Sequence, residues 1–218
     1  MSTSQPILVS QRMPEKMVRD EEQFASLCAA TTLAHVAYSS PDGPRIFPTA
    51  FAILDDRLVI HGSTGSRWMR HLVGQPVSVA ITKLDGLVVA RSTFESSVLY
   101  RSAMVFGEFS IVGPDRAESL LARLSDRLIP GRSTEVRASL RKELAATMLL
   151  EMPLEQWSLR VSDGWPEDEE PDLSGDAWAG VVRLGTPAVA AESDPNLRAG
   201  IPVPASVTRL LEIPNGVV

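Results

Sequence analysis

Residue types that build metal, disulfide or membrane structures are scarce in this chain of 218 residues. Its one cysteine, Cys28, excludes a disulfide within the chain, and its three histidines lack the spacing of zinc ligands. No apolar run reaches the ~20 residues that span a bilayer. The net charge of −6 is the opposite of the basic excess that generic nucleic-acid binding needs. The sequence therefore predicts no metal, nucleic-acid or membrane partner.

The first twenty residues also lack the apolar run of a signal peptide, so we expect a cytoplasmic protein. Hydrophobic residues make up 44% of the chain and charged residues 22%, as in ordinary globular proteins. We expect an N-terminal arm over residues 1–19, one domain over 20–162, and an irregular C-terminal extension over 163–218. That extension is expected to pack on the barrel or on a partner subunit.

The order of expected elements favours a mainly β fold. Helices are predicted at 20–30, 66–73, 113–128 and 133–144, and strands at 33–38, 45–53, 57–61, 77–82, 86–92, 98–112, 147–152 and 157–161. This is not the regular strand–helix alternation of a doubly wound sheet. Strands joined by short turns, with local helices between them, predict a small antiparallel barrel with peripheral helices.

The segment His61-Gly62-Ser63-Thr64-Gly65-Ser66-Arg67 has the composition of an anion site. A predicted strand ends there and a helix begins, so unpaired backbone N–H groups point outward. The serine and threonine hydroxyls are donors, and Arg67 supplies a planar cation for a phosphate. The pattern suits a monophosphate, because the glycine and lysine pattern of a triphosphate loop is absent. An ordinary loop with a helix cap has the same composition, so the local chemistry leaves both interpretations open.

The order of motifs along the chain resembles the pyridoxamine 5′-phosphate oxidase-like, FMN-binding split-barrel family. The similar branch comprises flavin-nucleotide-binding proteins related to nitroimidazole-resistance proteins. The segments that carry the resemblance are 34–38, 45–51, 58–70, 84–92, 100–107, 127–132 and 178–181. They cover about residues 15 to 185, and the pairing of His-Gly-Ser-Thr-Gly-Ser with a later Tyr-Arg-Ser is the most specific part.

The resemblance implies a homodimer of six-stranded antiparallel split β-barrels of Greek-key type, with FMN at the subunit interface. Arg67 and Ser66 are then expected to hold the phosphate, with Gly62, Ser63 and Thr64 beside it. The flavin ring is expected along Pro48, Thr49 and Ala50, and the ribityl chain over Ile60 and His61. Ser102 lies where this family places a polar side chain on the flavin.

Three departures limit what the resemblance implies. Glu95 and Ser96 stand where close relatives carry histidines, and Trp68 stands where the oxidases carry a second basic residue. The C-terminal substrate motif of true pyridoxamine phosphate oxidases is absent. We therefore assign no pyridoxamine phosphate oxidation.

The catalytic residues are not identified, and the candidates are His61, Tyr100 and Arg101. His61 suits a proton shuttle or a strand-end histidine bonded to a carbonyl equally well. Tyr100 and Arg101 could bind an anionic substrate over the flavin ring, or they could form structural ion pairs beside a dimer interface.

Other residues have more ordinary interpretations. His35 is expected to be a hydrogen-bonded barrel histidine, and Cys28 a buried apolar residue. The acidic run 167–172 is expected to be a solvated loop. Trp178 is interpreted as an apolar anchor, with a lid over the cofactor as the alternative.

Two functions remain. The first is an FMN-dependent oxidoreductase that acts on a small molecule, with NAD(P)H as the donor that the family suggests. The second is a non-catalytic module that binds or senses a flavin or haem.

Overall fold

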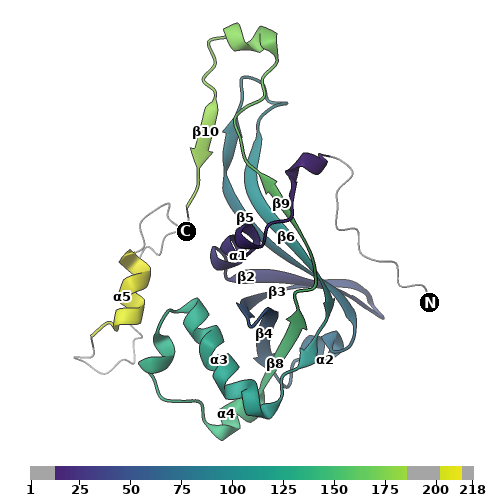
Figure 1. The fold of residues 1–218 in the computed structure, drawn as a ribbon, viewed down its shortest axis with the longest axis vertical. Coiled ribbons are helices and arrows are strands. Elements are labelled where there is room, and N and C mark those ends of the chain that lie inside the picture. The colour runs from purple at the N-terminus through teal and green to yellow at the C-terminus, as the bar shows by residue number, and fades with distance from the viewer. Residues whose placement is uncertain (1–12, 186–201, 213–218) are drawn as a thin grey trace.

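The computed structural model describes residues 13–185 and 202–212. The helices are α1 (Glu21–Ala29), α2 (Arg67–Leu72), α3 (Pro114–Leu128), α4 (Arg141–Ala146) and α5 (Ala205–Glu212), and the 3-10 turns are η1 (Pro14–Lys16), η2 (Arg132–Thr134) and η3 (Glu170–Ser174). The strands are β1 (Met17–Val18), β2 (Leu33–Ser40), β3 (Gly43–Leu54), β4 (Arg57–Ser63), β5 (Pro76–Val89), β6 (Ser97–Glu108), β7 (Ser110–Ile111), β8 (Thr147–Pro153), β9 (Gln156–Ser162) and β10 (Gly180–Arg183). Figure 1 shows a twisted barrel with a long arm rising from it.

Six strands close the barrel. β6 bends at Phe109 and continues as β7, which pairs with β8, so the circuit runs β8-β4-β3-β2-β5-β6/β7 and back to β8. Every ladder among these strands is antiparallel. The main core lies inside this barrel and contains Val36, Phe51, Ile60 and Val79, each with 0–1% of its surface exposed. The expectation of a mainly β, six-stranded antiparallel split barrel is confirmed.

The barrel is split between β3 and β4. These two strands pair only from Phe51–Ile60 to Leu54–Arg57. The earlier part of β3, residues 43–50, pairs with β2, and the end of β4, residues 61–63, pairs with β8. The two strands therefore diverge after Ile60, and one edge of β3 has no strand beside it in the described part of the chain.

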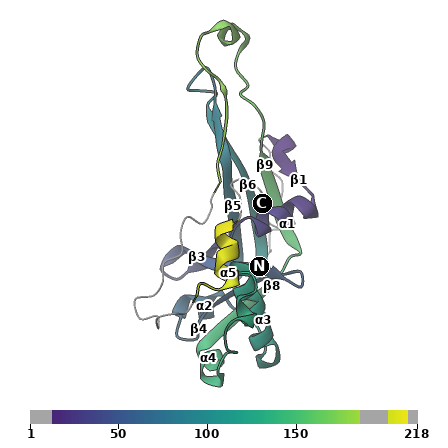
Figure 2. The same cartoon turned by 90° about the vertical axis from the view of Figure 1, so that its left-hand side faces the viewer.

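The arm is a long β5–β6 hairpin that stands clear of the barrel (Figures 1 and 2). We expected a break at Asp85-Gly86, but β5 continues through this point, with a shift in register between Leu84 and Gly86. A bulge absorbs the irregularity that the Asp-Gly pair indicated. β10 pairs with β5 from Gly86 to Val89, and a Cβ on Gly86 would lie 2.7 Å from the carbonyl oxygen of Val182. Gly86 therefore allows β10 to approach.

Two predicted helices have different outcomes. Asp20 caps α1 as expected, because its Oδ1 accepts hydrogen bonds from the N–H groups of Glu22 and Gln23. The helix predicted over 133–144 is wrong. Only η2 and the short α4 form there, because the carboxylate of Asp126 binds the N–H and hydroxyl of Ser133 and stabilises a turn.

The ends of the chain are more regular than expected. In the N-terminal arm, β1 pairs with β9, while residues 1–12 lie outside the described residues. The extension was expected to be irregular apart from residues 178–184, and β10 lies within that segment, whereas α5 was not expected. The carboxylate of Glu135 accepts hydrogen bonds from the backbone and hydroxyl of Ser206, and this capping positions α5 near η2.

Candidate functional site

The predicted phosphate loop joins β4 to α2, at the end of the split between β3 and β4. Ser63, Thr64 and Gly65 are exposed, and Ser66 is half-buried at the start of α2. The loop is anchored to the last residue of α4, because both the N–H and the hydroxyl of Thr64 donate to the carbonyl oxygen of Ala146. Their distances are 2.9 and 3.3 Å.

Hydrogen bonds within the loop decide which donors remain for an anion. The N–H of Gly65 donates to Ser63 Oγ at 3.1 Å, and the N–H of Ser66 donates to the Ser63 carbonyl at 2.9 Å. The donors of Thr64 are also used, as described above. The hydroxyl protons of Ser63 and Ser66 remain, since Ser63 Oγ only accepts and Ser66 makes no capping bond. Thr64 thus shapes the loop, and the hydroxyls of Ser63 and Ser66 remain as donors.

Two arginines of α2 have different roles. Arg67 is exposed at the first position of the helix. Arg70 donates from Nη1 to the carbonyl oxygen of Thr64 and holds the loop against the helix. The sequence interpretation missed Arg70. Its signal was the spacing of three residues from Arg67, which places both guanidiniums near one face of the helix.

The glycines of the loop serve packing more than close approach to a ligand. A Cβ on Gly62 would collide with Sδ of Met69, a residue of α2 whose side chain is fully buried. A Cβ on Gly65 would meet only Ser63 Oγ, at 3.4 Å. Neither glycine has a positive φ. Gly62 is therefore required so that α2 can pack on β4, whereas Gly65 is under no such constraint.

The expected ring-binding residues lie on the part of β3 that leaves β4. Pro48, Thr49 and Ala50 pair with His35, Ala34 and Leu33 of β2, and their other edge faces the split. Strand alternation places Pro48 and Ala50 on the outer face of the sheet. The side chain of Ile60 is buried inside the barrel, so only its backbone can line the split.

Ser102 lies on the outer face but apart from these residues. Its hydroxyl is 2.9 Å from that of Thr82, its neighbour on β5. β2 and β5 separate β6 from β3 in the sheet. One chain therefore does not bring Ser102 next to Pro48 and Ala50. Tyr100 lies further along β6, where its hydroxyl accepts a hydrogen bond from Arg160 Nε at 2.9 Å.

Arg101 forms a two-point ion pair inside its own chain. Its Nε and Nη2 donate to the two carboxylate oxygens of Asp85, each at 3.0 Å, and Nη1 donates to Ser26 Oγ at 3.2 Å. This pairing raises the pKa of Arg101 above its usual value. The guanidinium joins the β5 bulge to α1.

The three histidines occupy different environments. His61 is half-buried, and its Nδ1 is buried with no hydrogen-bond partner in the described part of the chain. Burial lowers its pKa below 6.5, so the imidazole is neutral at pH 7. His71 contacts the Ser39 carbonyl at 3.2 Å. His35 differs from expectation: its side chain is exposed on the outer face of β2, because strand alternation turns Ala34 and Val36 into the barrel instead.

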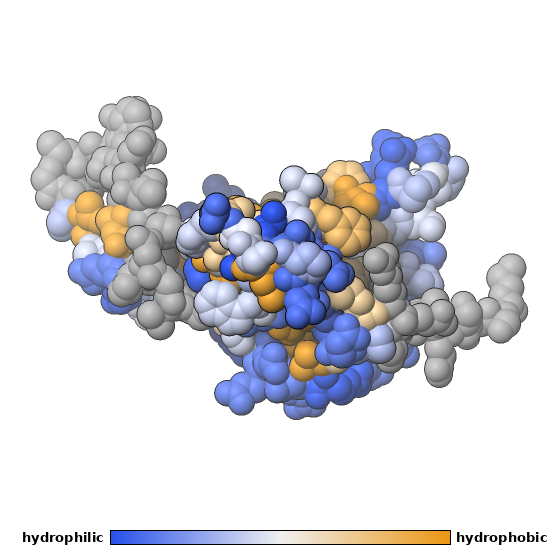
Figure 3. Space-filling model, turned by 90° about the horizontal axis from the view of Figure 1, so that it is seen from above, coloured by the Kyte–Doolittle hydropathy of each residue, from blue (hydrophilic) through white to orange (hydrophobic). Residues whose placement is uncertain are grey.

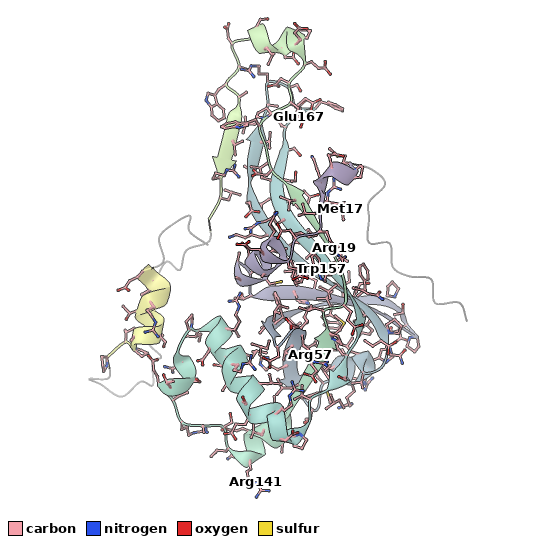
Figure 4. The ribbon with its side chains drawn as sticks, in the orientation of Figure 1. Met17, Arg19, Arg57, Arg141, Trp157 and Glu167 are labelled. Atoms are coloured by element: carbon pink, nitrogen blue, oxygen red, sulfur yellow. The ribbon has the colours of Figure 1, made fainter. Side chains whose placement is uncertain are left out.

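Residues outside the loop region have clear structural roles. Cys28 is buried, as expected. The acidic run is not wholly solvated, because the Asp168 carboxylate is 1% exposed and pairs with the backbone N–H and the guanidinium of Arg91 at 2.7 and 2.8 Å. Glu167 lies beside it near the tip of the arm (Figure 4). Trp178, 66% exposed, precedes β10 on the arm and does not cover the loop of its own chain.

Within residues 13–185 and 202–212, no group of three or more His, Cys, Asp or Glu side chains is placed to hold a metal ion. No helix of the same residues is long and apolar enough to cross a membrane.

Seen from the tip of the arm, apolar patches alternate with hydrophilic side chains (Figure 3). The arm carries the exposed aromatic residues Phe94, Trp165 and Trp178.

Comparisons with known proteins agree with this architecture. Residues 20–161 match the family model described as pyridoxamine 5′-phosphate oxidase. The FAD and haem binding protein from Mycobacterium smegmatis is 46% identical over 89% of this chain and 97% of its own, with a TM-score of 0.87. The flavocytochrome Anf3 from Azotobacter vinelandii is 30% identical over 92% of this chain and 94% of its own, with a TM-score of 0.85.

A 5-nitroimidazole antibiotic resistance protein from Bacteroides thetaiotaomicron, described as putative, shares the fold alone. It is 14% identical over 66% of this chain and 86% of its own, with a TM-score of 0.56. No curated protein matched this chain. The family resemblance expected from the motifs is confirmed.

Proposed function

This chain belongs to the pyridoxamine 5′-phosphate oxidase family, and we propose that it binds a flavin nucleotide through the FMN moiety, in the split between β3 and β4. The phosphate is held by Arg67, Ser66 and Ser63. Two relatives that this chain covers almost fully are named as a FAD and haem binding protein and as a flavocytochrome. Their names support a flavin as the ligand.

The observation that carries the proposal is the alignment of an unpaired strand edge with an anion site. The edge of β3 at Pro48, Thr49 and Ala50 offers backbone donors and acceptors to a planar heteroaromatic ring. The loop at the far end of the split offers two serine hydroxyls and the exposed Arg67. Gly62 and His61 lie between, where the ribityl chain passes. Thr64 contributes by fixing the loop to Ala146.

We further propose an oxidoreductase that acts on a small molecule with NAD(P)H as donor. The flavin supplies the redox chemistry when it is bound. The chain orients the ring along β3 and neutralises the phosphate charge through Arg67. Neutral His61 is available at the end of β4 to accept a proton, since its Nδ1 has no partner in the described part of the chain.

The site is completed in a homodimer. The outer face of the sheet exposes apolar side chains, with Leu33 47%, Ile46 67% and Leu84 47% exposed. Large apolar side chains exposed on one face of a sheet indicate a surface that a partner can cover. Ser102 and Tyr100 lie on β6, apart from the β3 edge of their own chain. A second copy placed on this face would bring such residues to the flavin.

The proposed function is tested by flavin binding to the purified full chain. We expect a yellow protein, and we expect Arg67→Ala to raise the flavin dissociation constant roughly ten-fold or more, because charge-assisted hydrogen bonds to the phosphate are lost. Arg183→Ala is the matched control, since Arg183 is an exposed arginine of β10 on the arm, away from the loop, whereas Arg141 lies on α4, which the loop contacts (Figure 4). A colourless protein that ignores added FMN and FAD would disprove the proposal.

A second candidate is a non-catalytic module that carries flavin with haem. The specific observation in its favour is His35, an exposed imidazole on the outer face of β2. It precedes by two residues Ala37, which lines a cavity of about 720 Å³ together with Ile46 and Phe106. Imidazole is a common axial ligand of haem iron. Added haem should give a Soret band that His35→Ala abolishes and His71→Ala preserves. Bleaching of the flavin by NADH or NADPH with repeated turnover would favour the enzyme instead.

A further inference from the structure

A cavity of about 590 Å³ lies at the end of β4 that is opposite the phosphate loop. It is bordered by α1, the β3–β4 turn, the C-terminal end of α3 and the β8–β9 turn. Arg123 of α3 donates to both carboxylate oxygens of Asp55 in the β3–β4 turn, at 2.6 and 2.8 Å. The N–H of Leu154 donates to the carbonyl oxygen of Asp56 at 3.2 Å and joins the two turns. The walls are therefore held in place without a ligand, as in most small-molecule sites.

The cavity follows the whole length of α1. The residues of α1 that line it are spaced three and four apart, as on one face of a helix, and they are Glu21, Phe24, Ala25, Cys28 and Ala29. At 1.5 Å per residue, this face is about 12 Å long. Phe24 stacks on Trp157 of β9 with 4.6 Å between the ring centroids, and the guanidinium of Arg19 lies 4.8 Å from the Trp157 centroid (Figure 4). The part of the cavity between its ends is therefore apolar and aromatic.

Opposite charges lie at the two ends of α1. Glu21, in the first turn, is exposed, and its carboxylate has no hydrogen-bond or ion-pair partner in residues 13–185 and 202–212. At the other end, Arg127 Nη2 donates to the carbonyl oxygens of Cys28 and Ala29, each at 2.6 Å. The Nη1 and Nε groups of Arg127 bond to none of the described residues, so they remain as donors. The cavity therefore has an anionic end and a cationic end.

We propose that this cavity binds a short peptide of apolar residues with free ends, a ligand separate from the proposed flavin. The ammonium group of the peptide pairs with Glu21 and its terminal carboxylate with Arg127, while a side chain packs on the aromatic pair. An extended peptide rises about 3.3 Å per residue, so three residues span about 10 Å and reach from one charge to the other. Asp56 also lines the cavity and accepts hydrogen bonds from peptide N–H groups.

The separation of the charges distinguishes this ligand from simpler ones. A fatty acid has no cation for Glu21, and an apolar amine leaves Arg127 unused. A free amino acid has both charges, but they are attached to one carbon atom and cannot reach both ends of α1. A peptide of about three residues has the length, the two charges and the apolar side chains together.

Isothermal titration of the full chain with the tripeptide Ala-Phe-Ala and its end-blocked forms tests the inference. N-acetylation removes the ammonium group and should weaken binding roughly three-fold or more, because an exposed ion pair contributes little. C-terminal amidation removes the carboxylate and should weaken binding roughly ten-fold, because half-buried Arg127 loses a charge-assisted hydrogen bond. This end is tested on the ligand because Arg127 also holds the end of α1.

Glu21→Gln is the matching change in the protein. It should weaken binding of the free tripeptide as much as acetylation does and leave binding of the acetylated form unchanged, since both changes remove the same interaction. Glu22→Gln is the control, because Glu22 is exposed on the same turn of α1 but does not line the cavity. It should change neither affinity.

Absence of a binding heat at millimolar tripeptide would overturn the inference, and so would an acetylated or amidated form that binds as tightly as the free peptide. An equal loss in Glu21→Gln and Glu22→Gln would show a general charge effect and would also overturn it. None of these results bears on the proposed flavin site, since the loop that carries Arg67 lies at the other end of β4.

Discussion

The guanidinium of Arg101 donates two parallel hydrogen bonds to the carboxylate of Asp85, from Nε to Oδ2 and from Nη2 to Oδ1, each 3.0 Å long. The two side chains are 19% and 21% exposed and lie on paired strands at the β5 bulge. Such a two-point pair fixes both orientation and register. A residue held in this way is a structural anchor of the arm.

Arg101→Ala should therefore lower the free energy of unfolding by about 2 kcal/mol, because a hydrogen-bonded charge pair is lost. Urea unfolding gives this value, and titration should show an unchanged flavin dissociation constant. Arg183→Ala is the matched control, since Arg183 pairs with Asp163 at 3.0 Å with both side chains about 60% exposed. That surface pair should contribute at most about 1 kcal/mol. Weaker flavin binding in Arg101→Ala without lost stability would instead place Arg101 at the ligand.

The two glycines of the phosphate loop should respond differently to alanine. In Gly62→Ala the new Cβ collides with Sδ of buried Met69, so we expect a loss of about 1–3 kcal/mol in unfolding free energy from overpacking. In Gly65→Ala the Cβ meets only Ser63 Oγ at 3.4 Å, and the change should stay within about 0.5 kcal/mol. Thermal and urea unfolding of the two variants check the contrast. Equal losses would show that backbone freedom, and not Met69, sets the requirement at Gly62.

In the ion pair that joins α3 to the barrel, the loss of one partner should destabilise the protein more than the loss of the other. Both oxygens of the Glu151 carboxylate accept from Arg116, at 2.8 and 2.9 Å, and Arg57 lies 4.0 Å away. Glu151 is 9% exposed whereas Arg116 is 43% exposed. Arg116→Ala leaves a buried carboxylate poorly paired, so it should destabilise the protein more than Glu151→Gln does, since water can hydrate Arg116. The reverse order in urea unfolding would contradict this account.

Cys28 should be inert in the folded protein. Burial raises the pKa of its thiol from 9.0 to about 12, so almost no thiolate exists at pH 8. A chromogenic disulfide reagent should detect one thiol only after unfolding. The thiol stabilises the fold fully below pH 9, and this contribution is lost as the pH rises from 9 toward 12, because the unfolded chain ionises first. Over that range the stability difference between the native protein and Cys28→Ala should shrink. Rapid labelling of native protein at pH 8 would contradict the burial argument.

Much of the fold was predictable because local signals agree with the final structure. Asp20 followed by two glutamates marked the start of α1, and alternation along β2 marked a strand with one buried face. The predictions failed where distant residues decided the conformation. Residues 133–144 have helical composition, but Asp126 turns the chain at Ser133. β5 passes through an Asp-Gly pair because β6 and β10 hold it on both sides.

The candidate site divides in the same way. The sequence by itself determined the family, the antiparallel barrel and the loop from Gly62 to Arg67, because hydrophobic period, turn chemistry and ordered motifs are written along the chain. Only the tertiary structure decided which loop donors remain, that Arg101 is bound to Asp85, and that Tyr38, Phe47 and Trp68 stack. Those facts depend on contacts between residues far apart in the chain. Closure of the barrel sets these contacts, and no local pattern encodes them.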